Sequence, residues 1–389
     1  MTKLNLQSWL LEHRQREPAV LLGAQGYPGG EQTFIASTPS SELRLKPGDV
    51  AALRRALNQK GSGRGAWVGY LSYEFALPFV HEPNLARSHA PWPAGFMRYY
   101  SDFNCLESSD VELPSGRAKP TLGLRADDTD EVHAGRVEAL KEQLIAGEVY
   151  EANLTRRFTA DAVDPSELFL DLAEHAPAPY AVFFETPFGA LVSNSPEAFL
   201  RLSAQGELSS FPIKGTRPRG HDGPTDERLR AELRVDEKEL AEHLMVVDLM
   251  RNDLGRVCQA GSVNCGELFE VVPFPGLWHM VTRVSGQLSP RFDRADLLAR
   301  TLPAGSISGA PKRAAVKHIA HLEAGPRGPY CGIFIIAPDD GSLLANVLIR
   351  TAVCSPDQTV LQAGGGIVLG SQPERECQET WLKLRNFSG

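Results

Sequence analysis

Two long segments in the C-terminal part of the chain carry apolar residues at helical spacing. The first runs from Val132 to Ala146 and stops before Gly147, and the second runs from Asp236 to Leu254. Residues three or four positions apart share a helix face, so each segment is predicted to pack one apolar face on a core. A third helix is predicted to begin at residues 371–374, where Ser-Gln-Pro-Glu has the pattern of a capping box with proline in the first turn.

Shorter segments between these helices have the composition of strands. Residues 149–158 partly alternate between apolar and polar positions, as a half-buried strand does. Residues 181–185 and 190–193 flank a Thr-Pro-Phe-Gly turn and predict a hairpin. Further strands are predicted at 281–288, 332–337, 344–350 and 359–363. Because strands joined by hairpins are separated by helices here, the pattern favours an α+β fold with antiparallel sheets over a doubly wound fold.

Periodicity is weakest between Pro83 and Asp128, where prolines and Ser/Gly pairs interrupt the chain. We therefore expect two parts, an N-terminal subdomain at residues 1–125 and a catalytic domain at residues 126–389. The length of 389 residues is compatible with either two domains or one large unit.

Charge and composition narrow the class of protein. The chain has 48 acidic and 40 basic residues, a formal charge of −8, whereas a dedicated nucleic-acid binder usually has a basic excess. A hydrophobic content of 42% is typical of a globular protein. No stretch approaches the ~20 apolar residues of a membrane helix, and no signal peptide is evident. We expect a cytoplasmic protein that binds neither nucleic acid nor membrane.

Two predicted helices each carry a Glu-x-x-Glu pair, Glu239 with Glu242 and Glu376 with Glu379. Residues three apart lie on one helix face, so each pair presents two carboxylates in one direction. Such oxygens suit Mg²⁺, which is often held by one or two carboxylates together with an anionic substrate. A solvated acidic face is the alternative for either pair alone.

Other candidate residues lie in small-residue loops and beside strands. Gly364–Gly366 and the loop 302–312 could bring backbone amides to an anion, although the loop could equally be a tight connection. Lys214 could act as a nucleophile or base, or lie at the surface. His279 could be a base or donor, or a satisfied buried histidine.

Taken together and in this order, these segments resemble the chorismate-utilising enzymes. The resemblance extends from about Val132 to Phe387, whereas the N-terminal third matches poorly beyond residues 69–74. It implies two large antiparallel sheets packed together with flanking helices. The residues that carry it lie at 195–197, 212–216, 242–256, 279–281, 302–312, 330–332, 349–351, 363–367 and 378–380.

The resemblance also implies a role for each candidate residue. Glu242 and Glu379 would hold Mg²⁺, with Glu239 and Glu376 supporting that site from one turn away. Glu197 resembles the general acid that protonates the departing 4-hydroxyl of chorismate, and His279 resembles an orienting active-site histidine. The residues implied to bind the substrate are Arg350, Tyr330, Gly305, Ser306, Gly364, Gly365, Gly366 and Lys383.

Lys214 discriminates between the reactions of this family. By resemblance, a lysine at this position attacks C2 of chorismate before ammonia enters at C4, which makes 4-amino-4-deoxychorismate. By resemblance, anthranilate synthases usually have alanine at this position. Isochorismate synthases place a water-activating lysine where this chain has Glu151. The resemblance implies glutamine at position 151 of this chain, so Glu151 is a departure from the family pattern. Anthranilate synthase component I and a non-catalytic chorismate-binding subunit are the alternatives.

The implied partners follow from the same resemblance. Ammonia would come from glutamine through a separate amidotransferase subunit, and the product would lead to 4-aminobenzoate and folate. At residues 19–23 the serine of a tryptophan-binding element is missing, so tryptophan binding is not expected.

Overall fold

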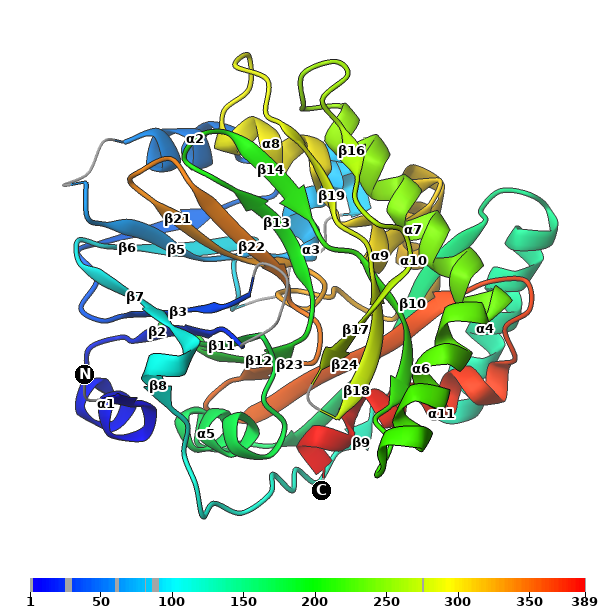
Figure 1. Cartoon of the computed structure of the whole chain (residues 1–389), viewed down its shortest axis with the longest axis horizontal. Coiled ribbons are helices and arrows are strands. Elements are labelled where there is room, and N and C mark those ends of the chain that lie inside the picture. The colour runs from blue at the N-terminus through cyan, green and yellow to red at the C-terminus, as the bar shows by residue number, and fades with distance from the viewer. Residues whose placement is uncertain are drawn as a thin grey trace.

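Two large antiparallel sheets lie face to face in the computed structural model, which describes residues 3–24, 30–59, 63–80, 82–85, 91–274 and 276–388 (Figure 1). In the described residues, the first sheet has the order β20 (Gly309–Ala310), β10 (Glu151–Asp161), β24 (Gln358–Ile367), β23 (Thr351–Cys354), β12 (Gly189–Ser195), β11 (Tyr180–Thr186), β2 (Ala19–Leu22), β3 (Gln32–Ala36) and β7 (Phe103–Glu107), and β9 (Arg125–Ala126) also pairs with β10. The second has the order β16 (Asn264–Cys265), β19 (Val284–Gln287), β14 (Glu207–Ser210), β13 (Ala198–Leu202), β22 (Leu343–Val347), β21 (Ile333–Pro338), β5 (Ala66–Leu71), β6 (Gly95–Tyr100) and β4 (Ser41–Leu45).

Aromatic side chains fill the space between the sheets. Phe184 of the first sheet lies 5.4 Å from Phe334 and 6.1 Å from Phe96 of the second, measured between ring centroids. All three rings are buried. Tilted and edge-on rings at such distances contribute attraction beyond the burial of their area, so this layer joins the sheets.

Helices cover the outer faces of both sheets. On the first sheet the apolar core includes residues of α1 (Leu6–His13), α5 (Pro165–His175) and α11 (Pro373–Ser388). On the second it includes residues of α2 (Val50–Asn58), α7 (Glu237–Gly255), α8 (Arg294–Thr301) and α10 (Lys312–Leu322). A smaller core joins α4 (Asp130–Ile145) and α10 to β10.

A third, small sheet stands beside the two large ones. It has the order β15 (Ile213–Pro218), β18 (Leu277–Val281) and β17 (Glu270–Phe274), and α6 (Gly223–Val235) packs on it. The chain enters it from β14 and leaves it to β19, which are neighbours in the second sheet. The small sheet is therefore anchored to the second sheet at both ends.

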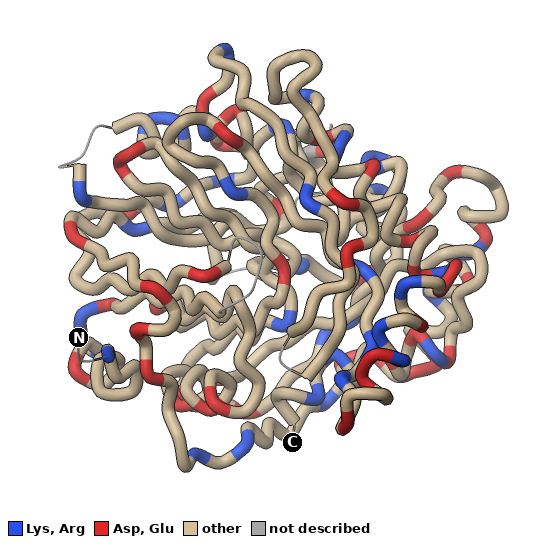
Figure 2. The backbone as a smooth tube through the Cα atoms, viewed as in Figure 1, with Lys and Arg blue, Asp and Glu red and all other residues tan. Residues whose placement is uncertain are grey.

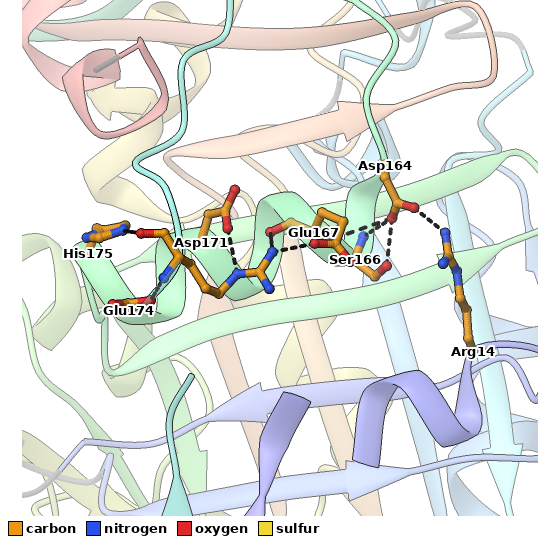
Figure 3. Close-up of polar contacts among 8 residues, drawn as sticks. Arg14, Asp164, Ser166, Glu167, Asp171, Glu174 and His175 are labelled. Carbon is orange, nitrogen blue, oxygen red and sulfur yellow. Dashed lines mark hydrogen bonds and ion pairs between the residues drawn. The ribbon is translucent and has the colours of Figure 1, made fainter. Parts of the chain in front are cut away.

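An extended segment at residues 113–124 has neither helix nor strand and runs past α5. Arg117 pairs with Glu167 and with Asp171, and its carbonyl contacts Nε2 of His175 at 2.8 Å. Glu174 accepts the backbone N–H groups of residues 116 and 117. On the same helix, Asp164 caps the first turn and pairs with Arg14 (Figure 3). These polar contacts hold the segment in place where a ladder of strand hydrogen bonds is lacking.

The sequence predictions of fold class, main helices and hairpin are confirmed. The helices α4, α7 and α11 and the hairpin of β11 with β12 occur where the apolar periodicity predicts them. The N-terminal residues supply β2, β3 and β7 to the first sheet and β4, β5 and β6 to the second. A boundary at residue 125 stays a prediction.

The region of weak periodicity contains β6 and β7, which belong to different sheets, as well as the extended segment 113–124. Two local predictions were wrong. The single strand predicted at 281–288 is two strands, because the chain leaves the small sheet at Val281 and enters the second sheet at Val284. Gly364–Gly366 lie within β24 instead of after it, paired with residues 153–155 of β10.

Acidic and basic residues are interspersed over the backbone, and both occur on the side of the molecule that carries α4, α6 and α11 (Figure 2). No helix in the described ranges is long and apolar enough to span a membrane.

The aromatic layer generates a stability prediction. Phe184→Ala removes a fully buried ring between the sheets, so the free energy of unfolding is expected to fall by about 3–5 kcal/mol. Urea denaturation followed by circular dichroism measures this. Leu369→Ala is the control, because Leu369 is 60% exposed and its truncation is expected to change stability by less than about 0.5 kcal/mol. Equal losses in both variants would contradict the assignment of the interior to this layer.

Candidate active site

A cavity of about 170 Å³ lies where the chain crosses between the two large sheets. One crossing joins β12 to β13 and carries Glu197, and the other joins β22 to β23 and carries Ile349 and Arg350. The two crossings run side by side, since the N–H of Val347 donates to the carbonyl of Glu197 at 3.1 Å. The cavity is lined by Asn153, Glu197, Ile213, Lys214, Ser306, Ile307, Tyr330, Ile349, Arg350, Gln362, Ala363, Gly364, Gly366, Lys383 and Leu384.

Glu197 is an acid whose surroundings favour its neutral form. Burial raises the pKa of the Glu197 carboxyl above its usual value. The hydroxyl of Ser306 donates to Oε1 at 2.6 Å and opposes this rise, as do the positive charges of three basic side chains of the cavity. Burial prevails, so Glu197 can keep a proton to a higher pH than an exposed glutamate.

Lys214 reaches the cavity from a bulge in β15. The register of β15 against β18 shifts between Lys214 and Thr216, and Gly215 between them has φ +77°, a conformation that costs glycine little. The Lys214 ammonium Nζ lies 3.6 Å from Oε1 of Glu151. Burial alone would lower the pKa of Lys214, but the carboxylates of Glu151, Glu242 and Glu197 together raise it. Lys214 therefore rests as an ammonium ion.

The glycines of β24 make room for carboxylates. A Cβ on Gly365 would lie 3.2 Å from carboxylate oxygens of both Glu376 and Glu379, and a Cβ on Gly366 would lie 2.0 Å from Oε1 of Glu151. The carbonyl of Gly364 accepts a hydrogen bond from Lys383 Nζ at 2.7 Å. The glycine run thus brings bare backbone against three acidic side chains.

The two acidic pairs lie on α7 and α11. On α11, Lys383 Nζ lies 2.6 Å from Glu379, and burial together with the charge of Glu379 raises the pKa of Glu376. On α7, Glu242 pairs with Lys238 at 3.7 Å. Lys238 also opposes the rise in the pKa of Glu376, so the two helices turn acidic residues toward a common region.

The four glutamates do not form one ready-made cluster. Glu239 pairs with Arg217 at 3.4 Å. Within the described residues, no group of three or more His, Cys, Asp or Glu side chains is close enough to hold a metal ion. A metal here would therefore need ligands beyond the protein, which is how Mg²⁺ is commonly bound.

His279 lies on β18, the strand paired with the strand of Lys214, and does not line the cavity. It is buried in β18 opposite Thr216, whose Oγ1 lies 2.9 Å from Nδ1. Burial lowers the pKa of His279 to about 4, and the carbonyl of Gly215 opposes this only in part. The imidazole is therefore neutral at pH 7 and contacts the strand that carries Lys214.

A buried ion pair holds together the two ends of the loop that carries Ser306. Ser306 belongs to the short helix α9 (Gly305–Ser308) in the loop before α10. At the first residue of α10, Lys312 Nζ donates to Asp253 at 2.8 and 3.0 Å and to the carbonyl of Thr301 at 3.0 Å. Gly305 packs on Leu249 and does not line the cavity.

Arg327 is a positioning residue that the sequence reading missed. Its fully buried guanidinium pairs with Glu323 at 2.7 Å and donates to the carbonyls of Ile307 at 2.8 Å and Asn153 at 2.5 Å. Its own carbonyl accepts from Gln362 Nε2 at 2.8 Å. The side chain and the carbonyl of Arg327 together thus connect three residues of the cavity wall.

Asn153 and Gln362 were also missed as cavity residues. Each is a polar residue within a predicted strand, and that interruption of apolar sequence is the signal that could have found them. Tyr330 and Arg350 lie in the wall, and Arg350 has a left-handed backbone with φ +50°. For a residue other than glycine this conformation is sparsely populated and recurs at functional sites.

The cavity brings together about half of the candidate residues. Those in its lining are Glu197, Lys214, Ser306, Tyr330, Arg350, Gly364, Gly366 and Lys383. Those outside the lining are Gly305, Gly365, His279, Glu239, Glu242, Glu376 and Glu379. An acid with a raised pKa, together with lysine and arginine side chains in one cavity, suits the binding and protonation of an anionic substrate.

Comparison with known proteins identifies a family. A model described as chorismate binding enzyme matches residues 24–389. Aminodeoxychorismate synthase component 1 of Escherichia coli (strain K12) is 34% identical over 361 residues, which cover 87% of this chain and 80% of that protein. Anthranilate synthase component 1 1 of Haloarcula marismortui is 41% identical over 261 residues, or 67% of this chain and 53% of that protein.

Solved structures support the fold. Anthranilate synthase component I from Streptococcus pneumoniae TIGR4 superposes with a TM-score of 0.81 over 95% of each chain, at 23% identity. A 2,3-dihydroxybenzoate-specific isochorismate synthase from Bacillus anthracis gives 0.77 over 98% of each chain, at 22% identity. Proteins named for different products thus share this architecture.

The role of Arg327 can be tested by its removal. Arg327→Met leaves Glu323 buried without its partner, so the free energy of unfolding is expected to fall by about 3–5 kcal/mol. Arg313→Met is the control, because Arg313 forms an exposed ion pair with Glu82 and its loss is expected to cost less than about 1 kcal/mol. Denaturant titration of both proteins measures the difference. An unchanged stability in Arg327→Met would contradict the connecting role.

Proposed function

The chain belongs to the chorismate binding enzyme family, and we propose that it aminates chorismate at C4 to give 4-amino-4-deoxychorismate. The observation that carries the proposal is Lys214, whose side chain reaches the same cavity as the acid Glu197. A lysine is the residue that, by resemblance, directs ammonia to C4. The E. coli relative named for this activity is 34% identical over most of the chain.

Binding of the substrate would rest on the cations of the cavity. Chorismate carries two carboxylates, and Arg350, Lys383 and Lys214 all line the space that would receive them. Charge-assisted hydrogen bonds from arginine and lysine to carboxylates are the stronger class. Tyr330 and Ser306 would complete the wall. The net charge of −8 describes the bulk of the protein and does not oppose an anionic substrate here.

In this proposal Glu197 and Lys214 carry the chemistry. Glu197 delivers its proton to the 4-hydroxyl as that group leaves, which its raised pKa favours. Lys214 forms a bond to C2 in the same step, and ammonia then enters at C4 while the lysine departs. His279 has no direct part in this sequence, since it lies outside the cavity lining on β18, the strand next to β15, and would support the strand that carries Lys214.

Magnesium fits the carboxylates of α7 and α11. Glu242 and Glu379 would bind it, with Glu239 and Glu376 one turn away. Burial and, to a lesser extent, the charge of Glu379 raise the pKa of Glu376, and a nearby cation would favour the ionised form of Glu376. When bound, the ion would neutralise one carboxylate of the substrate.

A second candidate function is the synthesis of anthranilate. The 41% identity to the Haloarcula protein favours it, and the lysine at position 214 opposes it. In either reaction ammonia would come from a separate glutamine amidotransferase subunit. With C4 amination, the product would serve 4-aminobenzoate and folate synthesis.

The product decides between these functions. Purified protein given chorismate, Mg²⁺ and ammonium is expected to form aminodeoxychorismate, measured as 4-aminobenzoate after a lyase is added. Removal of Mg²⁺ with EDTA is expected to abolish turnover. Anthranilate as the sole product would overturn the proposal, and absence of turnover with Mg²⁺ present would favour a non-catalytic subunit.

Lys214→Ala tests the residue that carries the proposal. C4 amination is expected to fall at least about a hundredfold, the scale seen when a participating group is lost. Some amination at C2 is expected to appear, because C2 is then open to ammonia. Lys119→Ala, which changes an exposed lysine, is the control. An unchanged product and rate in Lys214→Ala would remove Lys214 from the mechanism.

A further inference from the structure

Glu151 has no role in the chemistry described so far, although it is the nearest acid to Lys214. It is the first residue of β10, and its side chain is only 8% exposed. Its Oε1 lies 3.6 Å from Lys214 Nζ, and among the described residues this is the one ion pair of Lys214. The Lys214 side chain is 23% exposed, so the pair lies largely out of solvent at the proposed reaction site.

Three strands, β15, β10 and β24, position the ion pair of Lys214 with Glu151. The bulge in β15 places Lys214, the start of β10 places Glu151, and Gly366 of β24 leaves the space that the carboxylate occupies. Any side chain at 366 would put its Cβ 2.0 Å from Oε1 of Glu151. Residue 150, next to Glu151, is fixed by its N–H bond to the carbonyl of Ala310 at 2.7 Å. The pair is therefore built into the fold and is not a chance surface contact.

The resting charge of Lys214 creates a chemical problem for the proposed reaction. A primary amine attacks carbon through its lone pair, which an ammonium ion lacks. The charged and titratable groups that act on Lys214 or respond to it are Glu151 of β10, Glu242 and His243 of α7, and Glu197 between β12 and β13. The three carboxylates hold the proton on Lys214, and His243, with its pKa lowered by burial to about 4, is a poor base.

We propose that Glu151 accepts the proton of Lys214 as the amine attacks and returns it when the amine departs. The inference rests on the proposed function, since it supplies the base that a nucleophilic lysine requires. Glu197 is unsuited to this task because it must itself be protonated to release the 4-hydroxyl. Glu242 is engaged with Lys238 at 3.7 Å and lies among the carboxylates that fit Mg²⁺.

The first half of the reaction then balances. A proton moves from Lys214 Nζ to Glu151, and the freed lone pair forms the bond from nitrogen to C2. The two ring double bonds shift, the C4–O bond breaks with its electron pair, and the Glu197 proton joins that oxygen to release water. Lys214 is now a secondary ammonium on C2, Glu151 is neutral and Glu197 is ionised.

The second half restores both acids. Ammonia donates its lone pair to C4, the two ring double bonds shift back, and the C2–N bond breaks with its pair on Lys214. Glu151 returns its proton to the released amine, and the new ammonium group at C4 gives one proton to Glu197, so the product leaves as the amine. No oxidant or reductant is needed.

Glu151→Gln tests the proposal because it keeps the shape and removes the proton acceptor. At pH 7 the rate of C4 amination is expected to fall about a hundredfold. It is expected to recover by about tenfold per pH unit as Lys214 loses its proton to solvent, whereas the natural protein is expected to change little over the same range. Glu148→Gln is the matched control, since Glu148 is an exposed acid three residues earlier.

A structural role for Glu151 would give a different profile. Loss of rate by the same factor at every pH, or a profile equal to that of the natural protein, would overturn the inference. If Glu151→Gln does not fold, Glu151→Asp serves instead, and its shorter carboxylate is expected to give a partial loss that also recovers with pH. Formation of anthranilate by the natural protein would instead remove the proposed function and this inference together.

A readout without turnover completes the test. Lys214 is labelled with a small amine-reactive reagent across a range of pH, with neither chorismate nor Mg²⁺ present. The labelling rate, measured by mass spectrometry, reports the pKa of Lys214 directly. In Glu151→Gln the midpoint of the labelling rate against pH is expected to fall by about one pH unit or more, which is the shift expected from the loss of one nearby opposite charge. An unchanged midpoint would show that Glu151 does not hold the lysine proton and would overturn the inference.

Discussion

The buried guanidinium of Arg327 is the interaction on which the geometry of the cavity depends. It neutralises Glu323 in the interior and binds carbonyls of two elements, α9 and β10. Its backbone N–H also donates to Glu74, an acid whose pKa burial raises to about 7. A buried arginine is stable only when its donors are hydrogen-bonded. The positions of Asn153 and Ile307 in the cavity wall therefore depend on one another through Arg327.

The protonation states of Lys214 and Glu197 depend on the balance between burial and the neighbouring charges. Lys214 lies among three carboxylates and is held as an ammonium ion despite its burial. Glu197 lies among three cations and still tends toward its neutral form, because burial outweighs them. The raised pKa of Glu197 therefore suits a leaving-group acid, whereas the ammonium form of Lys214 lacks the lone pair that a nucleophile needs. A proton acceptor beside Lys214 reconciles its resting state with attack.

Periodicity predicted the long helices because each packs one apolar face on a single core. It failed at Thr282, where the chain passes between two sheets while the sequence stays strand-like, and at Gly364–Gly366, since glycines carry no side-chain pattern. Resemblance, not pattern, brought Lys214 and Glu197 together. Arg327 was missed because the sequence does not record the distant carbonyls that its guanidinium binds.

The N-terminal strands also close the two sheets. β2 pairs with β11 in the first sheet, and β5 pairs with β21 in the second, so each central strand receives a partner from more than a hundred residues away. Until those strands arrive, β11 and β21 expose a row of unpaired N–H and C=O groups along apolar sequence. Exposed edges of this kind pair with other chains. Keeping the N-terminal residues attached is therefore a protection against aggregation, and the many distant pairings imply slow folding.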